Sequence, residues 1–535
     1  MKTALLAVSL MLGPAAWGQG HSCENLHKLS IPNTRVLSAQ TVAAGSLRLQ
    51  GNSDAELAAG KPFMELPAFC RVVLEIEPAA GSRIPVELWM PAENWNGRFL
   101  GVGNGGFAGQ IGYRELATAV SKGYASAATD TGHSGSPIDA SWALGHPQAI
   151  IDFGYRAIHE MTLKSKMILQ SFYSGPLRHS YFAACSDGGR EALMEAQRFP
   201  QDYDGILAGA PAYNWTRLMT NAVVNSQALL LKPASYIPAA KLPAISAAAL
   251  EKCDKKDGLA DGILDDPRRC KFDPSVLLCK EADTNRCLTQ PQVDALHALY
   301  SGARDKAGQR IFPGYVPGGE LGEGGWGLWI LGPAPGRSLM NFFGNGYFAD
   351  MVYGNANWDY KTLSADTGLA DGLQKTGGAI DATNPDLRPF AKRGGRLILY
   401  HGWSDAAISA LSSIDYYNNV RTTASPATED STLRLFMVPG MQHCSGGPGP
   451  DSFGQAGPDS ASGPDDPQHD ILLALQHWVE DGVAPETVIA AQYAGEGAAR
   501  KITRTRPLCA YPKVARYKGA GSTDDAANFV CRAEP

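Results

Sequence analysis

The sequence predicts an α/β fold, in which a mostly parallel sheet carries helices on its faces and one long insertion interrupts the pattern. Up to about residue 212, short apolar runs typical of strands alternate with helix-like stretches, and this alternation favours a parallel sheet. The alternation stops over residues 213–387 and then resumes. We therefore expect one α/β domain in two parts, 19–212 and 388–535, with an inserted lid domain at 213–387, called the lid segment below.

The expected strands and helices can be placed along the two parts of the domain. Strand-like runs lie at residues 72–76, 84–90, 124–129, 180–184, 206–208, 397–400 and 433–438. Apolar residues at helical spacing occupy 155–173, 190–198 and 471–481. The helix at 190–198 follows the strand at 180–184 across a tight turn, which is where catalytic side chains of such folds often lie.

The beginning of the chain predicts export. Lys2 precedes the apolar run Ala4–Leu12, and Ala16 and Gly18 offer the small residues of a cleavage site. The run is too short to span a bilayer, so residues 1–18 are expected to be a signal peptide and the mature protein to be secreted or periplasmic. The net charge is -6, 19% of the residues are charged, and the sequence has no cluster of basic residues. We therefore expect no nucleic-acid or membrane partner.

Ten cysteines in an exported chain predict disulfides. Local spacing suggests three pairs, which are Cys253–Cys270, Cys279–Cys287 and Cys509–Cys531. This leaves Cys23 to pair with Cys70, and Cys185 with Cys444, although spacing alone does not determine the connectivity. Cys185 precedes Ser186 and Cys444 follows His443, so a bridge between them would tie two candidate catalytic residues together.

Ser186 lies in a sequence typical of a nucleophile elbow. The run Ala-Cys-Ser-Asp-Gly at 184–188 is a variant of Gly-x-Ser-x-Gly, with a strand expected before it and a helix after it. In such a turn the backbone N–H of the next residue, Asp187, helps to bind an oxyanion at the helix N-terminus. The alternative is that Ser186 only caps a helix beside glycines.

Asp405 and His443 are the expected partners of Ser186, since each lies just beyond a predicted strand. The chain order Ser, Asp, His is that of α/β-hydrolases. In such a triad His443 would take the serine proton and Asp405 would orient the imidazole. His401 and His133 also end strand-like runs, and for both we expect a structural hydrogen-bonding role.

A second oxyanion donor is expected from the glycine-rich loop Gly101–Phe107. Glycines let the backbone approach a ligand closely, and Gly106 is the preferred donor, with Gly105 close behind. A phosphate-binding loop is the alternative, but the Lys-Ser/Thr of a P-loop is missing from the sequence here.

The lid segment contains an acidic, glycine-rich loop between Cys253 and Cys270. It places Asp254, Asp257 and Asp261 within eight residues, and oxygen ligands crowded in this way suit Ca²⁺. The spacing is not that of an EF-hand. The alternative is an exposed acidic turn that the disulfide staples.

Together these motifs resemble the tannase and feruloyl esterase family. Other matching segments are Gly188–Arg190, Gln197–Pro200, Tyr203–Ile206, Ala208–Pro211 and Arg504–Pro512. The resemblance implies an α/β-hydrolase domain with a lid and a disulfide between Cys185 and Cys444. It also implies structural Ca²⁺, bound by the side chains of Asp254, Asp257 and Asp261 and the carbonyls of Leu259 and Ile263.

Within the family the chain especially resembles members that hydrolyse mono(2-hydroxyethyl) terephthalate, in Ser404–Ala407, Ser409–Leu411 and Asp415–Tyr417. Trp329 falls where those members have an aromatic residue against the substrate ring, so the resemblance implies that Trp329 binds substrate. Those members also hold a free carboxylate with a lid arginine, and Ser338–Asp350 contains none. For the remaining lid aromatics we expect core packing.

The resemblance and the motifs lead to one expected function. We expect a secreted serine carboxylesterase that hydrolyses small aromatic esters of the feruloyl, galloyl or mono(2-hydroxyethyl) terephthalate type through an acyl-enzyme. The alternatives are a calcium-dependent binding protein on an inactive hydrolase scaffold and an acyltransferase with the same triad. The complete Ser/Asp/His set argues against the first of these.

Overall fold

The computed structural model describes residues 21–49, 61–423, 430–456, 464–495 and 499–533. The signal peptide expected at residues 1–18 lies outside these ranges. Within them, no helix is both long and apolar enough to cross a membrane.

A nine-stranded sheet forms the centre of the molecule, in the order β1-β2-β3-β5-β4-β6-β7-β8-β9. Five of its eight strand pairings are parallel, from β5 through to β9, and the three at the β1 side are antiparallel. The strands are β1 (Thr34–Val42), β2 (Phe69–Ile76), β3 (Ile84–Pro91), β4 (Arg98–Val102), β5 (Ala125–Thr129), β6 (His179–Cys185), β7 (Gly205–Gly209), β8 (Arg396–Gly402) and β9 (Leu433–Val438). The expected mostly parallel sheet is confirmed.

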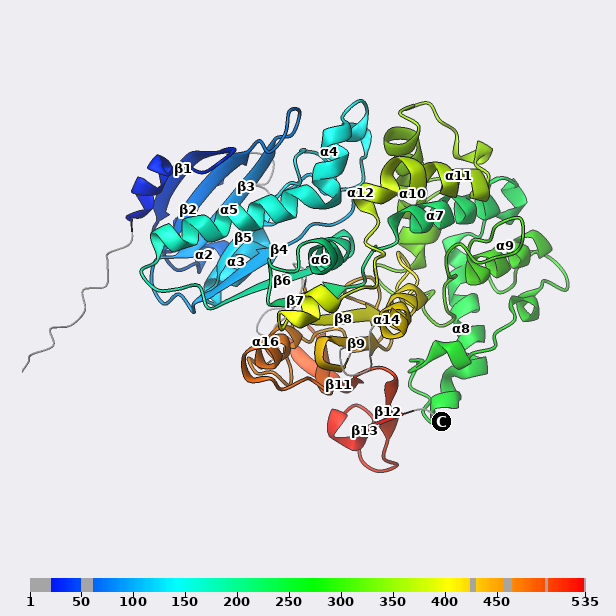
Figure 1. The fold of residues 1–535 in the computed structure, drawn as a ribbon. Helices are drawn as coiled ribbons and strands as arrows, with labels where there is room; N and C mark the ends of the chain where they lie inside the picture. Colours follow the sequence, from blue (N-terminus) through cyan, green and yellow to red (C-terminus); the bar gives the residue numbers. More distant parts are fainter. Residues whose placement is uncertain (1–20, 50–60, 424–429, 457–463, 496–498, 534–535) are drawn as a thin grey trace, which may run out of the picture.

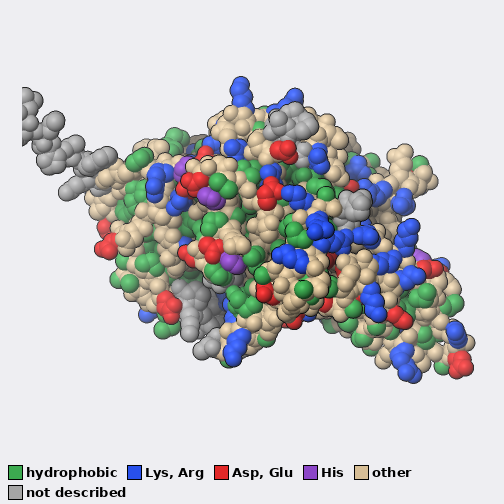
Figure 2. Space-filling model, turned by 90° about the horizontal axis from the view of Figure 1, so that it is seen from below, with side chains coloured by type: hydrophobic (Ala, Val, Ile, Leu, Met, Phe, Trp, Pro, Cys, Tyr) green, Lys and Arg blue, Asp and Glu red, His purple; other side chains and the backbone are tan. Residues whose placement is uncertain are grey.

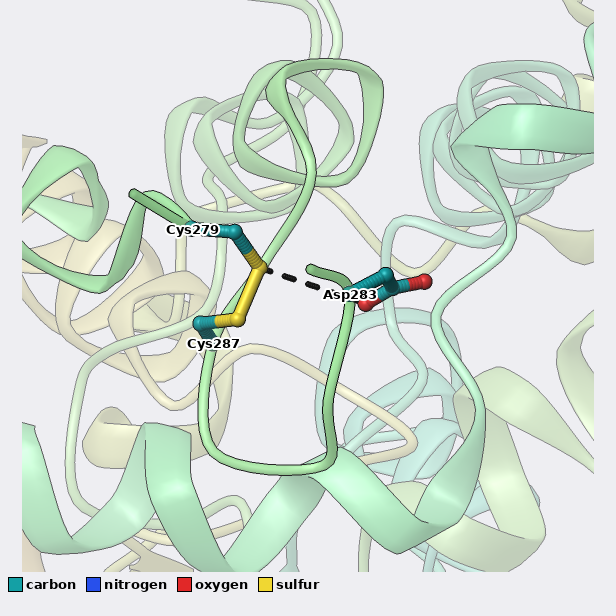
Figure 3. Close-up of side chains that lie close together, drawn as sticks. All are labelled: Cys279, Asp283 and Cys287. Carbon is teal, nitrogen blue, oxygen red and sulfur yellow. Dashed lines mark hydrogen bonds between the residues drawn. A yellow bond between two sulfur atoms is a disulfide. The ribbon is translucent and has the colours of Figure 1, made fainter. Parts of the chain in front are cut away.

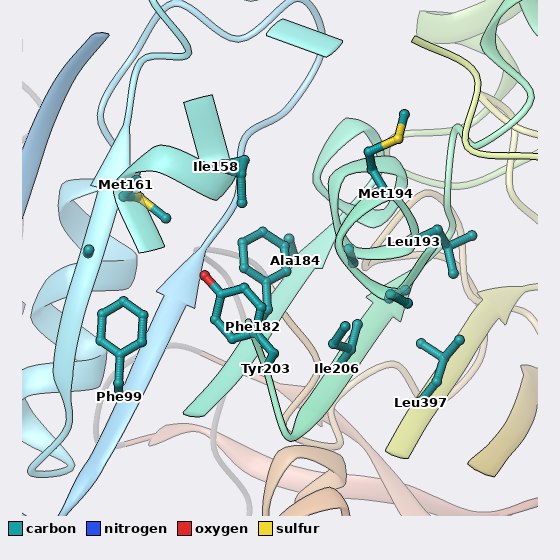
Figure 4. Close-up of a cluster of buried hydrophobic side chains, with 14 of the residues drawn as sticks. Phe99, Ile158, Met161, Phe182, Ala184, Leu193, Met194, Tyr203, Ile206 and Leu397 are labelled. Atoms are coloured by element: carbon teal, nitrogen blue, oxygen red, sulfur yellow. The ribbon is translucent and has the colours of Figure 1, made fainter. Parts of the chain in front are cut away.

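Helices cover both faces of this sheet. They are α2 (Lys61–Met64), α3 (Tyr113–Ser121), α5 (Ala157–Phe172), α6 (Asp187–Arg198), α13 (Arg388–Lys392), α14 (Leu411–Thr423) and α16 (Ile471–Asp481). The short α4 (Pro147–Ile151) packs toward the lid segment instead. The core under α5 and α6 includes Phe182 of β6, Ile206 of β7 and Leu397 of β8, all buried (Figure 4). The core of the other face joins α3 and α16 to the same strands. Apolar runs buried on both faces explain why the strand-like segments of the sequence were continuous.

The lid segment follows β7 and ends just before β8, and Figure 1 shows its helices gathered on the side of the molecule away from β1. These helices are α7 (Trp215–Leu230), α8 (Leu242–Cys253), α9 (Gln290–Ser301), α10 (Leu339–Gly346), α11 (Ala365–Gly372) and α12 (Gly378–Ile380). Most of the lid aromatics pack in its own core, as expected, with Trp326, Tyr347 and Phe348 almost fully buried. The structure thus has the expected α/β-hydrolase architecture with a large insertion.

Four C-terminal strands form two small antiparallel ribbons outside the main sheet. They are β10 (Thr487–Ala494) with β11 (Lys501–Cys509), and β12 (Lys513–Tyr517) with β13 (Phe529–Ala533). The ribbons touch the lid, since Arg506 pairs with Asp261 and Arg516 donates a hydrogen bond to the Asp257 carbonyl. Acidic, basic and hydrophobic side chains all reach the face of the molecule shown in Figure 2.

All five expected disulfides are present. They are Cys23–Cys70, Cys185–Cys444, Cys253–Cys270, Cys279–Cys287 and Cys509–Cys531. The Cys185–Cys444 bridge joins residues 259 positions apart in the sequence. It therefore links the end of β6 to the loop after β9.

Candidate active site

Ser186 occupies the turn between β6 and α6 in a strained conformation. Its φ of 68° and ψ of -122° lie outside the regions that L-residues favour, which is typical of a nucleophile elbow. The turn needs small neighbours: a Cβ on Gly188 would lie 2.5 Å from the Ala184 Cβ and 2.8 Å from the Asn104 carbonyl oxygen. This packing leaves the Ser186 side chain partly exposed.

The structure brings Ser186, His443 and Asp405 together in one chain of hydrogen bonds. The Ser186 hydroxyl lies 2.8 Å from His443 Nε2, and His443 Nδ1 lies 2.8 Å from Asp405 Oδ2. Because a carboxylate only accepts, Nδ1 carries the proton and Nε2 accepts from Ser186. This is the tautomer that a general base needs.

Asp405 is held as an anion by its surroundings. Burial alone would raise the pKa of its carboxyl, but the neighbouring His443 and His401 hold that pKa well below the ordinary value. The backbone N–H groups of Ala407 and Ile408 each donate to Oδ1 at 2.8 Å. Oδ2 is left to the two imidazoles, so the carboxylate stays ionised and fixed beneath His443.

His401 and His133 have the structural roles expected of them. His401 Nε2 lies 3.1 Å from both Asp405 Oδ2 and the Ile408 carbonyl, and its Nδ1 accepts from the Ser413 hydroxyl at 2.7 Å. His133 is bonded to the Phe107 carbonyl at 2.7 Å, and burial lowers its pKa to about 4. Both imidazoles therefore have partners in the scaffold.

Asp187 is the first residue of α6, so its backbone N–H has no acceptor within the helix and can be offered to an oxyanion. Its side chain points the other way. The carboxylate is fully buried and accepts from Arg190 Nε at 2.6 Å. Arg190 is itself anchored to the carbonyls of Gly154 and Phe153 at 2.6 and 2.9 Å. The buried arginine thus fixes the first turn of α6.

The glycine-rich loop lies against this first turn. Gly188 N donates to the Asn104 carbonyl at 2.8 Å, and Asn104 N donates to Glu191 Oε2 at 2.9 Å. Gly106 has a φ of 61°, and a Cβ there would lie 2.2 Å from the Pro137 carbonyl oxygen, so the position requires glycine. Gly105 is more exposed, with open space around its Cα. The oxyanion role of Gly106 or Gly105 stays a prediction.

Aromatic side chains of the lid line one side of the site. The Trp329 ring meets His443 edge to face with centroids 5.1 Å apart, and stacks on Phe343 at 5.8 Å. Phe343 in turn lies 5.2 Å from Phe107, the last residue of the glycine-rich loop. The rings of Trp329, Phe343 and Phe107, called the aromatic wall below, extend from His443 to the glycine-rich loop. Trp329 is half-buried, so part of its ring remains accessible.

The acidic lid loop gathers four carboxylates. Asp254, Asp257 and Asp261 are joined by Asp265, which the sequence analysis did not single out. Their oxygens accept mainly backbone N–H groups of the same loop, such as Leu259 N to Asp257 and Ile263 N to Asp261. Burial, followed by the charge of Asp257, raises the pKa of Asp265 to about 7. An oxygen-only set of crowded carboxylates fits a hard divalent cation.

Three residues were assigned no part in the site by the sequence analysis. Arg190 holds the Asp187 carboxylate, Asp265 joins the acidic loop, and Phe343 of α10 belongs to the aromatic wall. His401, for which a structural role was expected, shares the Asp405 carboxylate with His443. The three-residue spacing of Asp187 and Arg190 on one helix is a signal in the sequence that could have indicated their contact.

Comparison with known proteins finds a family model described as "Tannase and feruloyl esterase", which matches residues 70–532. An uncharacterised esterase of Xanthomonas campestris is 41% identical over 557 residues, which cover 99% of this chain and 94% of that protein. A probable feruloyl esterase B-1 of Aspergillus fumigatus is 34% identical, over 95% of this chain and 94% of its own.

Solved structures agree with these relatives. Feruloyl esterase B from Aspergillus oryzae superposes with a TM-score of 0.85 and 31% identity, over 95% of this chain and 99% of that one. Tannin acyl hydrolase from Aspergillus niger, at 24% identity, gives a TM-score of 0.73 over 94% and 92% of the two chains, and this match shows the fold alone.

Proposed function

Because the chain belongs to the tannase and feruloyl esterase family and is a carboxylic ester hydrolase, we propose that it hydrolyses small aromatic esters with Ser186 as nucleophile. The observation that carries this proposal is the continuous chain of hydrogen bonds from Ser186 through His443 to Asp405. Ser186 terminates this chain in the strained elbow, where its hydroxyl is partly exposed.

The reaction follows from this geometry in two steps. His443 Nε2 takes the hydroxyl proton as Ser186 Oγ attacks the ester carbonyl, and Asp405 stabilises the imidazolium that forms. The Asp187 N–H, with Gly106 as second donor, stabilises the oxyanion. His443 then gives the proton to the departing alcohol. Water, activated by the same imidazole, cleaves the acyl-enzyme and releases the aromatic acid.

The aromatic wall favours substrates whose acyl group is aromatic. A planar ring would lie beside Trp329 and Phe343, with its ester carbonyl near Ser186. Methyl ferulate, methyl gallate and mono(2-hydroxyethyl) terephthalate therefore form the panel that tests the proposal. We expect turnover of at least one. If calcium-loaded, folded protein releases no acid from any of them, the aromatic-ester proposal fails; if a competing alcohol captures the acyl group in preference to water, the protein is an acyltransferase.

Replacing Trp329 tests the wall directly. In Trp329→Leu we expect kcat/KM for the preferred aromatic ester to fall about 10- to 100-fold, because a large ring contact is lost. The fall should be much smaller for a short aliphatic ester such as methyl butyrate. Leu328→Ala is the matched control, since Leu328 is the exposed neighbour of Trp329. Equal losses on both esters would contradict a role in recognising the acyl ring.

The Cys185–Cys444 bridge is proposed to keep Ser186 and His443 within hydrogen-bonding distance, because each cysteine is the chain neighbour of one of them. We expect the double variant Cys185→Ser/Cys444→Ser to lose roughly 100-fold or more in kcat while still folded, since a displacement of about 1 Å costs that much. Near-UV circular dichroism would confirm folding in the same sample. The control is Cys279→Ser/Cys287→Ser, which opens an exposed bridge in the lid. If both double variants keep wild-type activity, the bridge has no catalytic role.

Ca²⁺ is proposed to bind the acidic lid loop through Asp254, Asp257, Asp261 and the carbonyls of Leu259 and Ile263. It would neutralise the four carboxylates of the loop, whose charge exceeds that of the neighbouring Arg506 and Arg516. We expect chelation to lower Tm by several degrees and Ca²⁺, but not Mg²⁺, to restore it, because the site offers flexible oxygen ligands. Asp257→Asn should remove most of the shift. A Tm unchanged by chelation would argue for an acidic turn without metal.

Export is proposed from the cysteines. Five disulfides among the described residues fit an oxidising compartment, and the expected signal peptide would direct the chain to one. Expression with residues 1–18 in place should deliver the mature protein to the periplasm or medium.

A further inference from the structure

A second group of titratable side chains lies at the opposite end of α6 from Ser186. It consists of His159 on α5, Glu195 on α6 and Asp202 in the loop before β7. One nitrogen or oxygen atom of each lies within 4.8 Å of those of the other two. Glu195 is nine residues after Ser186, or roughly 13 Å along the helix at 1.5 Å per residue, so this group is separate from the ester site.

Glu195 is a buried acid without a hydrogen-bond donor. Its residue is only 1% exposed, and no group in the described part of the chain donates to either carboxylate oxygen. The group that faces it is the carboxylate of Asp202, which is also buried. Burial, and then this facing carboxylate, raise the pKa of Glu195 well above its ordinary value. Two buried carboxylates that face each other need a positive charge or a shared proton between them.

His159 completes the group and gives it access to solvent. Its Nδ1 lies 2.6 Å from Asp202 Oδ2, and its side chain is 23% exposed. The imidazole stacks on Phe199, with ring centroids 3.7 Å apart and planes at 12°. This stacking holds Nδ1 toward Asp202, and the imidazole is the partly exposed member of an otherwise buried group.

The charges around the group leave it net negative. Asp204 is paired with Arg393 at 2.6 Å. Lys166 donates to the Ser180 hydroxyl at 3.1 Å and to the Asp202 backbone carbonyl, so its ammonium group is held by neutral oxygens. The single positive charge of Lys166 thus stands against two carboxylates, Glu195 and Asp202. An added cation would be stabilised there.

We propose that His159, Glu195 and Asp202 bind a divalent transition-metal ion, with Zn²⁺ as the best fit. One imidazole nitrogen and two carboxylate oxygens are three of the ligand types that zinc takes, and water from the His159 side completes a fourfold shell. The imidazole disfavours Ca²⁺ and Mg²⁺, which prefer oxygen ligands. The ion would join α5 to the C-terminal end of α6, the helix that begins next to Ser186.

Another group of potential metal-ligating residues serves as a contrast. Cys279, Asp283 and Cys287 also lie close together, but the two cysteines are joined in a disulfide, as Figure 3 shows, and so offer no thiolate. Asp283 is moreover paired with Lys241. Asp283→Asn is therefore the matched control for a variant of the proposed zinc site.

The test is a zinc titration of the full mature chain, chelated first and then kept in millimolar Ca²⁺ so that the lid loop is saturated. Isothermal calorimetry and metal analysis of dialysed samples would count bound Zn²⁺. We expect one equivalent in the wild type and in Asp283→Asn. In His159→Ala and Glu195→Gln the affinity should fall at least ~100-fold, because loss of even an outer-shell partner costs 10- to 100-fold. Zn²⁺ should raise Tm in the wild type and not in these two variants.

His159→Ala removes a partly exposed ring and is expected to fold, so it decides the question even if Glu195→Gln does not. Zinc bound equally by the wild type and His159→Ala would overturn the proposal, as would a wild type that binds none. If the wild type binds no zinc, the Glu195 and Asp202 carboxylates share a proton instead of a metal ion. Glu195→Gln should then be more stable than the wild type at mildly alkaline pH, since its amide can donate to Asp202 without any ion.

Discussion

Ser186→Ala is expected to lower kcat for the preferred aromatic ester by about 10⁵- to 10⁶-fold, the loss seen when the nucleophile of a triad is removed. The hydroxyl has no substitute within the site, since His443 Nε2 is bonded to Ser186 itself. The fold should be retained. Alanine is no larger than serine, and the turn that holds this residue is supported by backbone contacts such as Ser186 N to the Gly209 carbonyl.

Single-turnover and steady-state assays on purified protein would measure this loss, with Tm as the check on folding. Ser404→Ala is the matched control, because Ser404 is a buried serine next to Asp405 and is outside the hydrogen-bond chain. We expect the control to stay within a few-fold of the wild type. A Ser186→Ala protein that kept more than a hundredth of wild-type turnover would require another nucleophile.

Asp405→Asn is expected to lower kcat by about 10⁴-fold with little effect on KM. An asparagine that turns its amide toward His443 donates to Nδ1, which moves the imidazole proton to Nε2. Nε2 then faces Ser186 with a hydrogen and cannot accept the hydroxyl proton. The change keeps the shape of the side chain, so the backbone donors Ala407 and Ile408 retain an oxygen to bind.

The kinetics of Asp405→Asn are best compared with Asp415→Asn, which removes a charge from the partly exposed pair with Arg310. Asp415→Asn should behave like the wild type. If the two variants lose the same small amount of activity, Asp405 does not set the tautomer of His443, and the account of the triad is wrong.

Much of this site could be predicted because each triad residue lies just after a strand that the sequence indicates. Ser186 lies between a strand and a helix, and Asp405 and His443 each come just after a buried strand. Since the carboxyl ends of parallel strands meet at one edge of a sheet, these positions had to converge. The pairing of Cys185 with Cys444 came instead from elimination and from the family resemblance. Apolar runs predicted β2, β3 and β5 through β9, because those strands are largely buried on both faces. The short β4, which contains Arg98 and Gly101, was not predicted.

Some strands and helices differ from those predicted from the sequence, and the differences have physical causes. β1 is mostly exposed and polar, so its residues show no apolar run, and it could not be recognised. Helix α6 begins at Asp187 and not at Arg190, because its first turn is buried. Gly188 packs against β6 and the glycine-rich loop, and Gly189 packs against the end of β7. Packing overrides the low helix propensity of two adjacent glycines.

The group of His159, Glu195 and Asp202 could not have been predicted from the sequence. The three residues lie 36 and 7 positions apart, with no ligand spacing that a motif would capture. Their contact depends on how α5 packs across α6, which Figure 1 shows and sequence periodicity does not encode. Asp265 is different, since it lies within the acidic loop and was distinguishable from its neighbours only by burial.

Ser186 is proposed to be the covalent nucleophile, and labelling with a fluorophosphonate followed by peptide mass analysis identifies the residue that reacts. We expect a single phosphonyl adduct, on the peptide that contains Ser186. Labelling should be slower in Asp405→Asn, and Ser186→Ala should carry no adduct. A folded, calcium-loaded wild type that takes up no label, or an adduct that persists in Ser186→Ala, would show that Ser186 is not the nucleophile.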